Sequence, residues 1–221
     1  MTGDVTVASD TGSRVALGSG WTFNNPSMIT SVTPSSGQVG TAVVIAGTLL
    51  LSERDGTTVV SVTLNGIAAD LVSGTSQTSV QVVARSSLGG SGLGDVVVTA
   101  DSGAVATAVN GWRYLAVGVI SSVLPAVGQY GTRVTISGTL LLGGGISVQS
   151  ATLNGVAASV EAQSDLQIVI RAGNGTAGSG DVRIVSNTGA VVQASGAWAY
   201  AVASAVTSVT PSSGQGSTGR W

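Results

Sequence analysis

The chain has no cysteine and no histidine, and only 8% of its 221 residues are charged. Without cysteine it can form no disulfide, and without either residue it can build no zinc finger and no cysteine–histidine nucleophile. All eight basic residues are arginine and the net charge is −2. A nucleic-acid partner requires a basic stripe that neutralises phosphates, so none is expected.

Long hydrophobic runs are also missing, although the mean hydropathy is positive at +0.46. The apolar residues come in short runs such as Leu115 to Ile120, far below the ~18 residues that a membrane-spanning helix needs. We therefore expect no membrane insertion in this segment. No basic region followed by an apolar stretch stands at the N-terminus, so no signal peptide is visible.

Carboxylates are too few and too scattered to predict an enzyme. The two glutamates, Glu53 and Glu161, lie at unmatched positions, and glycoside hydrolysis needs two carboxyl groups that flank one bond. With histidine and cysteine also absent, we expect no catalytic residue, no bound metal and no cofactor.

One ten-residue signature occurs three times, and it organises the rest of the chain. It spans residues 29–38, 120–129 and 206–215, and its prolines are spaced by 91 and then 86 residues. A tryptophan near the other end of the unit repeats at the same two spacings, as Trp21, Trp112 and Trp198. Matched spacing at both ends indicates a tandem array.

The repeat divides the chain into four parts. We predict two complete domains, flanked by the end of a truncated preceding repeat and the start of a truncated following repeat. In chain order the parts are 1–28 (a C-terminal hairpin plus linker), 29–115, 120–201 and 206–221.

Each complete unit has the pattern of an all-β domain. Val43 and Ile45 stay apolar in the second copy, whereas Val44 becomes Thr135, and this period of two indicates a half-buried strand. Asn65-Gly66 between alternating apolar residues predicts a tight hairpin. About seven short strands per unit predict tandem immunoglobulin-like β-sandwiches without a disulfide.

The joints between units have constant length. Six positions separate the last aromatic residue of each unit from the first residue of the next signature, as from Tyr114 to Ile120. A constant, short junction predicts an extended and stiff rod. The hairpin within 1–23 lacks its own sandwich, so we expect it either to be poorly ordered or to dock on the open edge of another chain.

The signature resembles the IPT/TIG family of immunoglobulin-like domains. The likeness rests on the pattern Ile-x-Ser-Val-x-Pro-x-x-Gly-Gln, followed by Leu-Asn-Gly and a Gly-Asp-Val strand. It covers nearly the whole chain and implies the sandwich fold. Similar domains occur in plexin-type receptor ectodomains, Rel-type transcription factors, starch-active enzymes and repetitive cell-surface proteins. The missing basic loops argue against the transcription-factor branch.

Several residues are candidates for binding or modification sites. Trp21, Trp112 and Trp198 could contact a sugar ligand or a neighbouring domain, or simply pack in the core. Asn174-Gly175-Thr176 is a glycosylation sequon, which a eukaryotic source could use. The carboxylates repeated at strand starts and turns are better explained as turn residues than as calcium ligands; they are Asp4, Asp95 and Asp181, and then Asp10 and Asp101 with Asn187.

These observations favour a non-catalytic structural or adhesive segment of a larger extracellular or cell-surface protein. Its partners would be neighbouring repeats, with other surface proteins or glycans as further candidates. The alternative is a carbohydrate-binding or spacer module attached to a larger enzyme, which an exposed aromatic cluster would favour.

Overall fold

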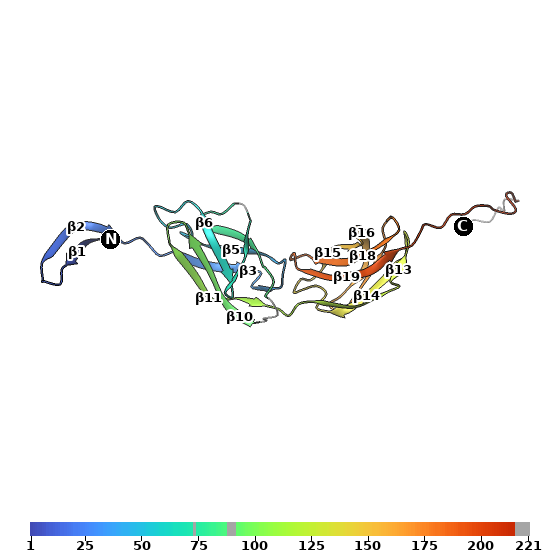
Figure 1. Ribbon diagram of the computed structural model, residues 1–221, viewed down its shortest axis with the longest axis horizontal. Coiled ribbons are helices and arrows are strands. Elements are labelled where there is room, and N and C mark those ends of the chain that lie inside the picture. Colours follow the sequence, from blue (N-terminus) through green and yellow to red (C-terminus); the bar gives the residue numbers. More distant parts are fainter. Residues whose placement is uncertain (73, 88–91, 215–221) are drawn as a thin grey trace.

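The computed structural model describes residues 1–72, 74–87 and 92–214. It shows two β-sandwiches arranged end to end, with a separate hairpin at the N-terminal end and an extended segment at the C-terminal end (Figure 1). No helix forms among these described residues. The last part of the predicted truncated repeat, residues 215–221, lies outside them.

The strands fall into three groups, one for each repeat unit along the described chain. The N-terminal hairpin consists of β1 (Thr2–Ala8) and β2 (Arg14–Thr22). The first sandwich contains β3 (Met28–Thr33), β4 (Ser36–Gly37), β5 (Ala42–Thr48), β6 (Val59–Leu64), β7 (Ile67–Ala68), β8 (Asp70–Leu71), β9 (Ser79–Val83), β10 (Gly92–Ala100) and β11 (Val105–Tyr114). The second contains β12 (Val119–Leu124), β13 (Val127–Gly128), β14 (Arg133–Thr139), β15 (Val148–Leu153), β16 (Val156–Gln163), β17 (Gln167–Arg171), β18 (Gly178–Ser186) and β19 (Val191–Tyr200).

The two sandwiches share one topology. In the first, a sheet of order β4-β11-β10-β6-β7 packs on a sheet of order β3-β5-β9-β8. In the second, β16 is continuous and pairs with both β15 and β17, so the same two layers are joined into one sheet of eight strands. The short strands β4 and β13 pair in parallel with the last strand of their sandwich.

The core of each sandwich comes from alternating apolar residues, as the period of two predicted. In β5, Val43 and Ile45 are 1% and 0% exposed, whereas Val44 between them is 42% exposed. Each sandwich has its own cluster of buried side chains. Because neither cluster is shared, each sandwich contains a hydrophobic core of its own.

One tryptophan and one tyrosine fill the same place in each core. Trp112 and Tyr114 meet edge to face, with ring centroids 5.6 Å apart, and Trp198 and Tyr200 repeat the contact at 5.5 Å. All four side chains are buried. Two large aromatic rings on the last strand thus fill part of each core.

The N-terminal hairpin repeats β10–β11 without the layer that covers it. Gly3 pairs with Trp21 as Gly94 pairs with Trp112. However, Trp21 is 58% exposed where Trp112 is fully buried. The hairpin therefore has the local strand pairing of a complete unit but lacks the hydrophobic core of one.

Replacing Trp112 with alanine should destabilise the first sandwich by about 3–5 kcal/mol, because a large buried ring leaves a cavity. Trp21→Ala is the matched control, since the same residue at the same strand position is exposed. Chemical denaturation followed by circular dichroism measures both. Equal shifts for the two variants would contradict the assignment of Trp112 to the core.

Backbone amides of the isolated hairpin should exchange faster than those of its covered counterpart. A two-stranded hairpin is marginally stable in water without packing, so residues 4–23 should show lower protection than residues 95–114. Hydrogen exchange on a dilute monomeric sample checks this. Equal protection of the two segments would show that the hairpin is stabilised by something other than its own pairing.

Candidate functional site: the joint between the sandwiches

The tryptophans that are candidate ligand contacts lie apart, one in each unit. Trp112 and Trp198 are 0% and 1% exposed, so in this arrangement neither ring presents a face on which a sugar could stack. Their burial favours core packing. Trp21 is the exposed member of the set.

The repeated aspartates stabilise an irregularity in the facing strand. Asp95 Oδ1 accepts a hydrogen bond of 2.8 Å from the backbone amide of Asn110, where the register shifts and φ is +53°. Asp4 and Asp181 do the same for Ser19 (2.7 Å) and Gly196 (2.9 Å). They lie inside β1, β10 and β18 rather than at the strand starts that the sequence suggested, because these strands begin earlier.

The next repeated position ties a loop to a turn. Asp101 accepts hydrogen bonds from the Thr57 amide (2.9 Å) and the Thr57 hydroxyl (2.5 Å). Asn187 uses its side-chain oxygen in the same way, accepting from the amide of Ile146 at 2.9 Å. Asp10 lies in the exposed turn between β1 and β2. Across the part of the chain that the structure describes, no group of three or more carboxylates comes together that could hold a metal ion.

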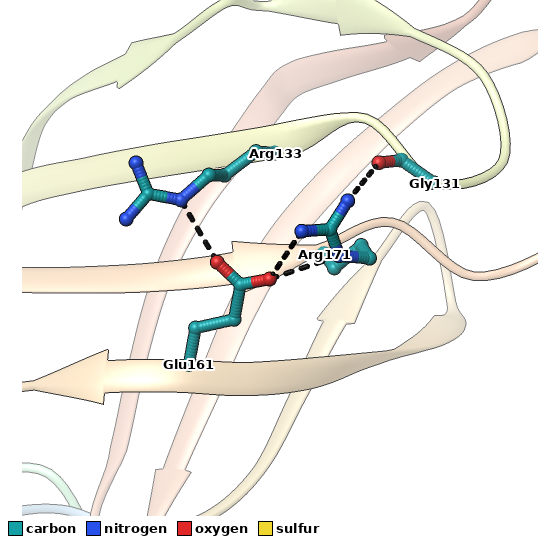
Figure 2. Close-up of polar contacts among 4 residues, drawn as sticks. All are labelled: Gly131, Arg133, Glu161 and Arg171. Atoms are coloured by element: carbon teal, nitrogen blue, oxygen red, sulfur yellow. Dashed lines mark hydrogen bonds and ion pairs between the residues drawn. The ribbon is translucent and has the colours of Figure 1, made fainter. Parts of the chain in front are cut away.

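The two glutamates lie in different sandwiches and form no pair. Glu53 accepts hydrogen bonds from the amide (2.8 Å) and side chain (3.1 Å) of Asn25, which fastens the linker after the hairpin to the first sandwich. Glu161 lies between two arginines, Arg133 and Arg171 (Figure 2). Asn174, the sequon residue, is exposed in the loop between β17 and β18.

A recess of about 640 Å³ lies beside the hairpin. The exposed ring of Trp21 contributes to its lining, together with polar and charged side chains from the linker and the first sandwich, which include Asn24, Asn25, Arg54 and Asp55. The recess is open and contains one aromatic ring among polar groups.

The sandwiches meet directly, through the end of the first and a turn of the second. The Ala42 amide donates to the Thr188 carbonyl (2.8 Å), and the Val191 amide donates to the Val39 carbonyl (3.1 Å). These two backbone hydrogen bonds run in opposite directions across the contact. They fix the turn before β19 against the start of β5.

The side chain of Gln38 completes this joint. Its Oε1 accepts a hydrogen bond of 2.7 Å from the Gly118 amide in the linker, and its Nε2 donates to the Val191 carbonyl at 3.3 Å. The side chain is 1% exposed, so a buried polar group satisfies both ends of its amide across the two domains.

Glycines allow the close approach of the two backbones. A Cβ atom on Gly40 would lie 2.7 Å from the Gly189 carbonyl oxygen, and one on Gly189 would lie 2.7 Å from the Gly40 oxygen. The backbone φ is +88° at Gly40 and +86° at Gly189, a region of backbone conformation that favours glycine. The run 143–145 also passes close to the first sandwich, where a Cβ on Gly144 would lie 2.6 Å from Leu115.

Sequence reasoning predicted a joint of constant geometry but missed Gln38 as its central residue. The signal was present, since glutamine closes all three copies of the signature at 38, 129 and 215. The side-chain amide of glutamine can both donate and accept hydrogen bonds, so its repetition in every copy was a signal for a hydrogen-bonding role.

Hydrogen bonds from Thr57 lower the pKa of Asp101 to about 2, from an ordinary value of 3.8. The folded-state pKa lies below the unfolded one, so this carboxylate stabilises the first sandwich above pH ~4 and loses that effect as the pH falls toward 2. Thr57→Val should raise the Asp101 pKa toward 3.8, as carbon-13 NMR titration would show.

The pKa of Asp70, which a hydrogen bond from Arg85 lowers, should stay unchanged in that variant and serves as its control. An Asp101 pKa that did not move in Thr57→Val would show that the threonine hydroxyl is not the cause.

Comparisons with known proteins agree with this architecture. The model of the IPT/TIG domain family matches residues 26–113 and 119–200. A search of curated proteins finds no match. The full extracellular region of Plexin A4 is similar at 18% identity over 87% of this chain and 17% of that chain, with a TM-score of 0.53. At that identity, the similarity shows the fold alone.

Two further solved structures match with lower structural scores. SGBP-B of the Bacteroides ovatus mixed-linkage glucan utilization locus, in complex with a mixed-linkage heptasaccharide, has 15% identity over 91% of this chain and 54% of that chain, with a TM-score of 0.32. Gamma-CGTase from Alkalophilic bacillus clarkii has 15% identity over 73% and 23%, with a TM-score of 0.34. The chain thus spans less than a fifth of the plexin chain and about half of SGBP-B.

The family model covers both sandwiches and most of the chain. The sandwich topology, the two separate cores and the repeated signature agree with it. The protein belongs to the IPT/TIG domain family.

Proposed function

We propose that this chain is a non-catalytic, rod-forming segment of a larger extracellular or cell-surface protein. In this role the TIG sandwiches act as rigid spacers that set the distance between other parts of the protein. The observation that carries the proposal is the direct joint, in which Gln38 hydrogen-bonds to the linker and to the second sandwich.

The joint leaves little freedom for a hinge. Only residues 115–118 separate β11 from β12, and the amide at the end of this linker is already bonded to Gln38. Two backbone hydrogen bonds add a second line of contact between the domains. Flexible tethers are longer and are not bonded to the domains they join.

The charged groups support a structural role rather than chemistry. The carboxylates of Asp101 and Glu161 each accept hydrogen bonds that hold loops or strands together, and Asp70 pairs with Arg85. The extracellular setting is supported by the low charge and by the extracellular region of Plexin A4 with which the fold is shared. No described helix is both long and apolar enough to cross a membrane.

A carbohydrate-binding module is the second candidate, and the recess beside Trp21 favours it. An exposed indole among amide and charged side chains is a suitable surface for a sugar ring. Against it stands the burial of Trp112 and Trp198, the counterparts of Trp21 in the complete units. Calorimetric titration with a panel of glucan oligosaccharides, repeated on Trp21→Ala, distinguishes the two functions.

The rod is tested by substituting its joint. In the intact chain, residual dipolar couplings should give one common alignment tensor for both sandwiches. Gln38→Ala should separate the tensors, because it leaves the Gly118 amide and the Val191 carbonyl without these bonds and weakens docking by roughly 1–3 kcal/mol.

Gln129→Ala is the matched control, because Gln129 occupies the same place in the second sandwich and does not contact the first joint. In the Gln129→Ala variant the two sandwiches should keep a common alignment tensor. Two different tensors in the unsubstituted chain would overturn the rigid-rod function.

A further inference from the structure

We propose that the far end of the second sandwich is a docking surface for a third TIG repeat that continues from residue 206. The surface consists of Gln129, Tyr130, Gly131 and Arg133, and we call it the Gln129 end. This inference rests on the proposed function, because it extends the same rod by one unit.

Half of a second joint is already present at the Gln129 end. The Gln129 amide donates to Thr132 Oγ1 at 3.0 Å, as the Gln38 amide does to Thr41 Oγ1 at 3.1 Å. Gln129 Oε1 then accepts from the Ser204 amide at 2.9 Å, which reproduces the bond between Gln38 and Gly118. The glutamine thus holds the outgoing linker in the same way at both ends.

The other half of the joint is open. Gln38 Nε2 donates to Val191 of the next sandwich, whereas Gln129 Nε2 has no partner among the residues that the structure describes. A Cβ on Gly40 would collide with Gly189, but one on Gly131 would have no atom within 4 Å, although its φ of +81° is nearly the same. Tyr130, at the position of Val39, is 73% exposed.

One hydrogen bond and two salt bridges connect the Gln129 end to the neighbouring strands β16 and β17. Arg171 Nη1 donates to the Gly131 carbonyl at 3.0 Å, and Glu161 bonds both Arg171 and Arg133 (Figure 2). Arg133 meets Glu161 through Nε, and its two terminal nitrogens point away from the carboxylate (Figure 2). A surface that is ordered in advance loses less entropy on docking.

The completed joint defines the chemistry of the occupant. It must offer a turn with a carbonyl for the Arg133 amide, an amide for the Tyr130 carbonyl and a glycine at the closest approach, as Thr188, Val191 and Gly189 do for the first sandwich. A TIG repeat carries this turn just before its last strand. The signature at 206–215, at the repeated spacing, places the start of such a repeat directly after the linker.

The test extends the chain by one unit, so that residues 1–205 are followed by a second copy of residues 120–221. The Arg133 amide, which corresponds to the bonded Ala42 amide, should then exchange roughly tenfold more slowly than in the unextended chain. The third sandwich should share an alignment tensor with the second.

Two matched variants separate the joints within the extended chain. Gln129→Ala should restore fast exchange of the Arg133 amide and let the third sandwich reorient relative to the second. Gln38→Ala should let only the first sandwich reorient relative to the second. If the third sandwich folds but the Arg133 amide exchanges as fast as before, the inference is overturned while the rod function stands. If the first joint is also loose, the proposed function itself fails.

A different occupant of the Gln129 end would give a different experimental result. Slow exchange at Arg133 in the unextended chain that increases with protein concentration, together with self-association in analytical ultracentrifugation, would assign the Gln129 end to a second copy of this chain. That result would overturn the third-repeat assignment.

Discussion

The arrangement of this protein depends on one buried side-chain amide. Gln38 comes from the first sandwich, accepts a hydrogen bond from the linker and donates one to the second sandwich. Burying such a group is favourable only when both of its ends find partners, so the side chain penalises any orientation in which the second sandwich moves away. In the rod that we propose, this contact joins two independent cores, which lie end to end (Figure 1).

Glycine residues allow the backbones of the two sandwiches to come close enough for this contact. Gly40 and Gly189 approach so closely that any side chain on either would meet the other's carbonyl oxygen. The glycine run at 143–145 likewise lies so close to the joint that a Cβ on Gly144 would lie 2.6 Å from Leu115. Part of the high glycine content, 33 residues in all, therefore serves the joint, and the charged side chains, which are few, serve mainly to fasten loops and strands.

The sequence predicted the sandwich well, because the signals for strands are local. Alternation at Val43 and Ile45 reports directly which face is buried, and Asn65-Gly66 forms its hairpin turn with positive φ at both residues. The two-residue strands β4 and β13 could not be predicted from the sequence, because their parallel pairing produces no periodic pattern. The partner of Gln38 could not be predicted either, because Gln38 and Val191 are 153 positions apart and no local pattern connects them.

Among candidate site residues, repetition was a better guide than residue type. Aspartates at equivalent positions suggested turns, and the structure gives them a defined role in stabilising strand irregularities, as Asp95 does for Asn110. The tryptophans were ambiguous from sequence, because a repeated indole suits both a core and a sugar surface. Their burial depends on the opposite sheet, which a single strand pattern does not reveal.

The central claim is that the two sandwiches form one rigid unit, and a distance distribution between them tests it most directly. The chain has no native cysteine. Spin labels can therefore be attached at only two positions by the substitutions Ser61→Cys and Ser150→Cys, which lie at equivalent exposed positions in the two sandwiches. Double electron–electron resonance should give a single narrow distance. A broad distribution would contradict the account, because it would show that the sandwiches reorient about a flexible linker.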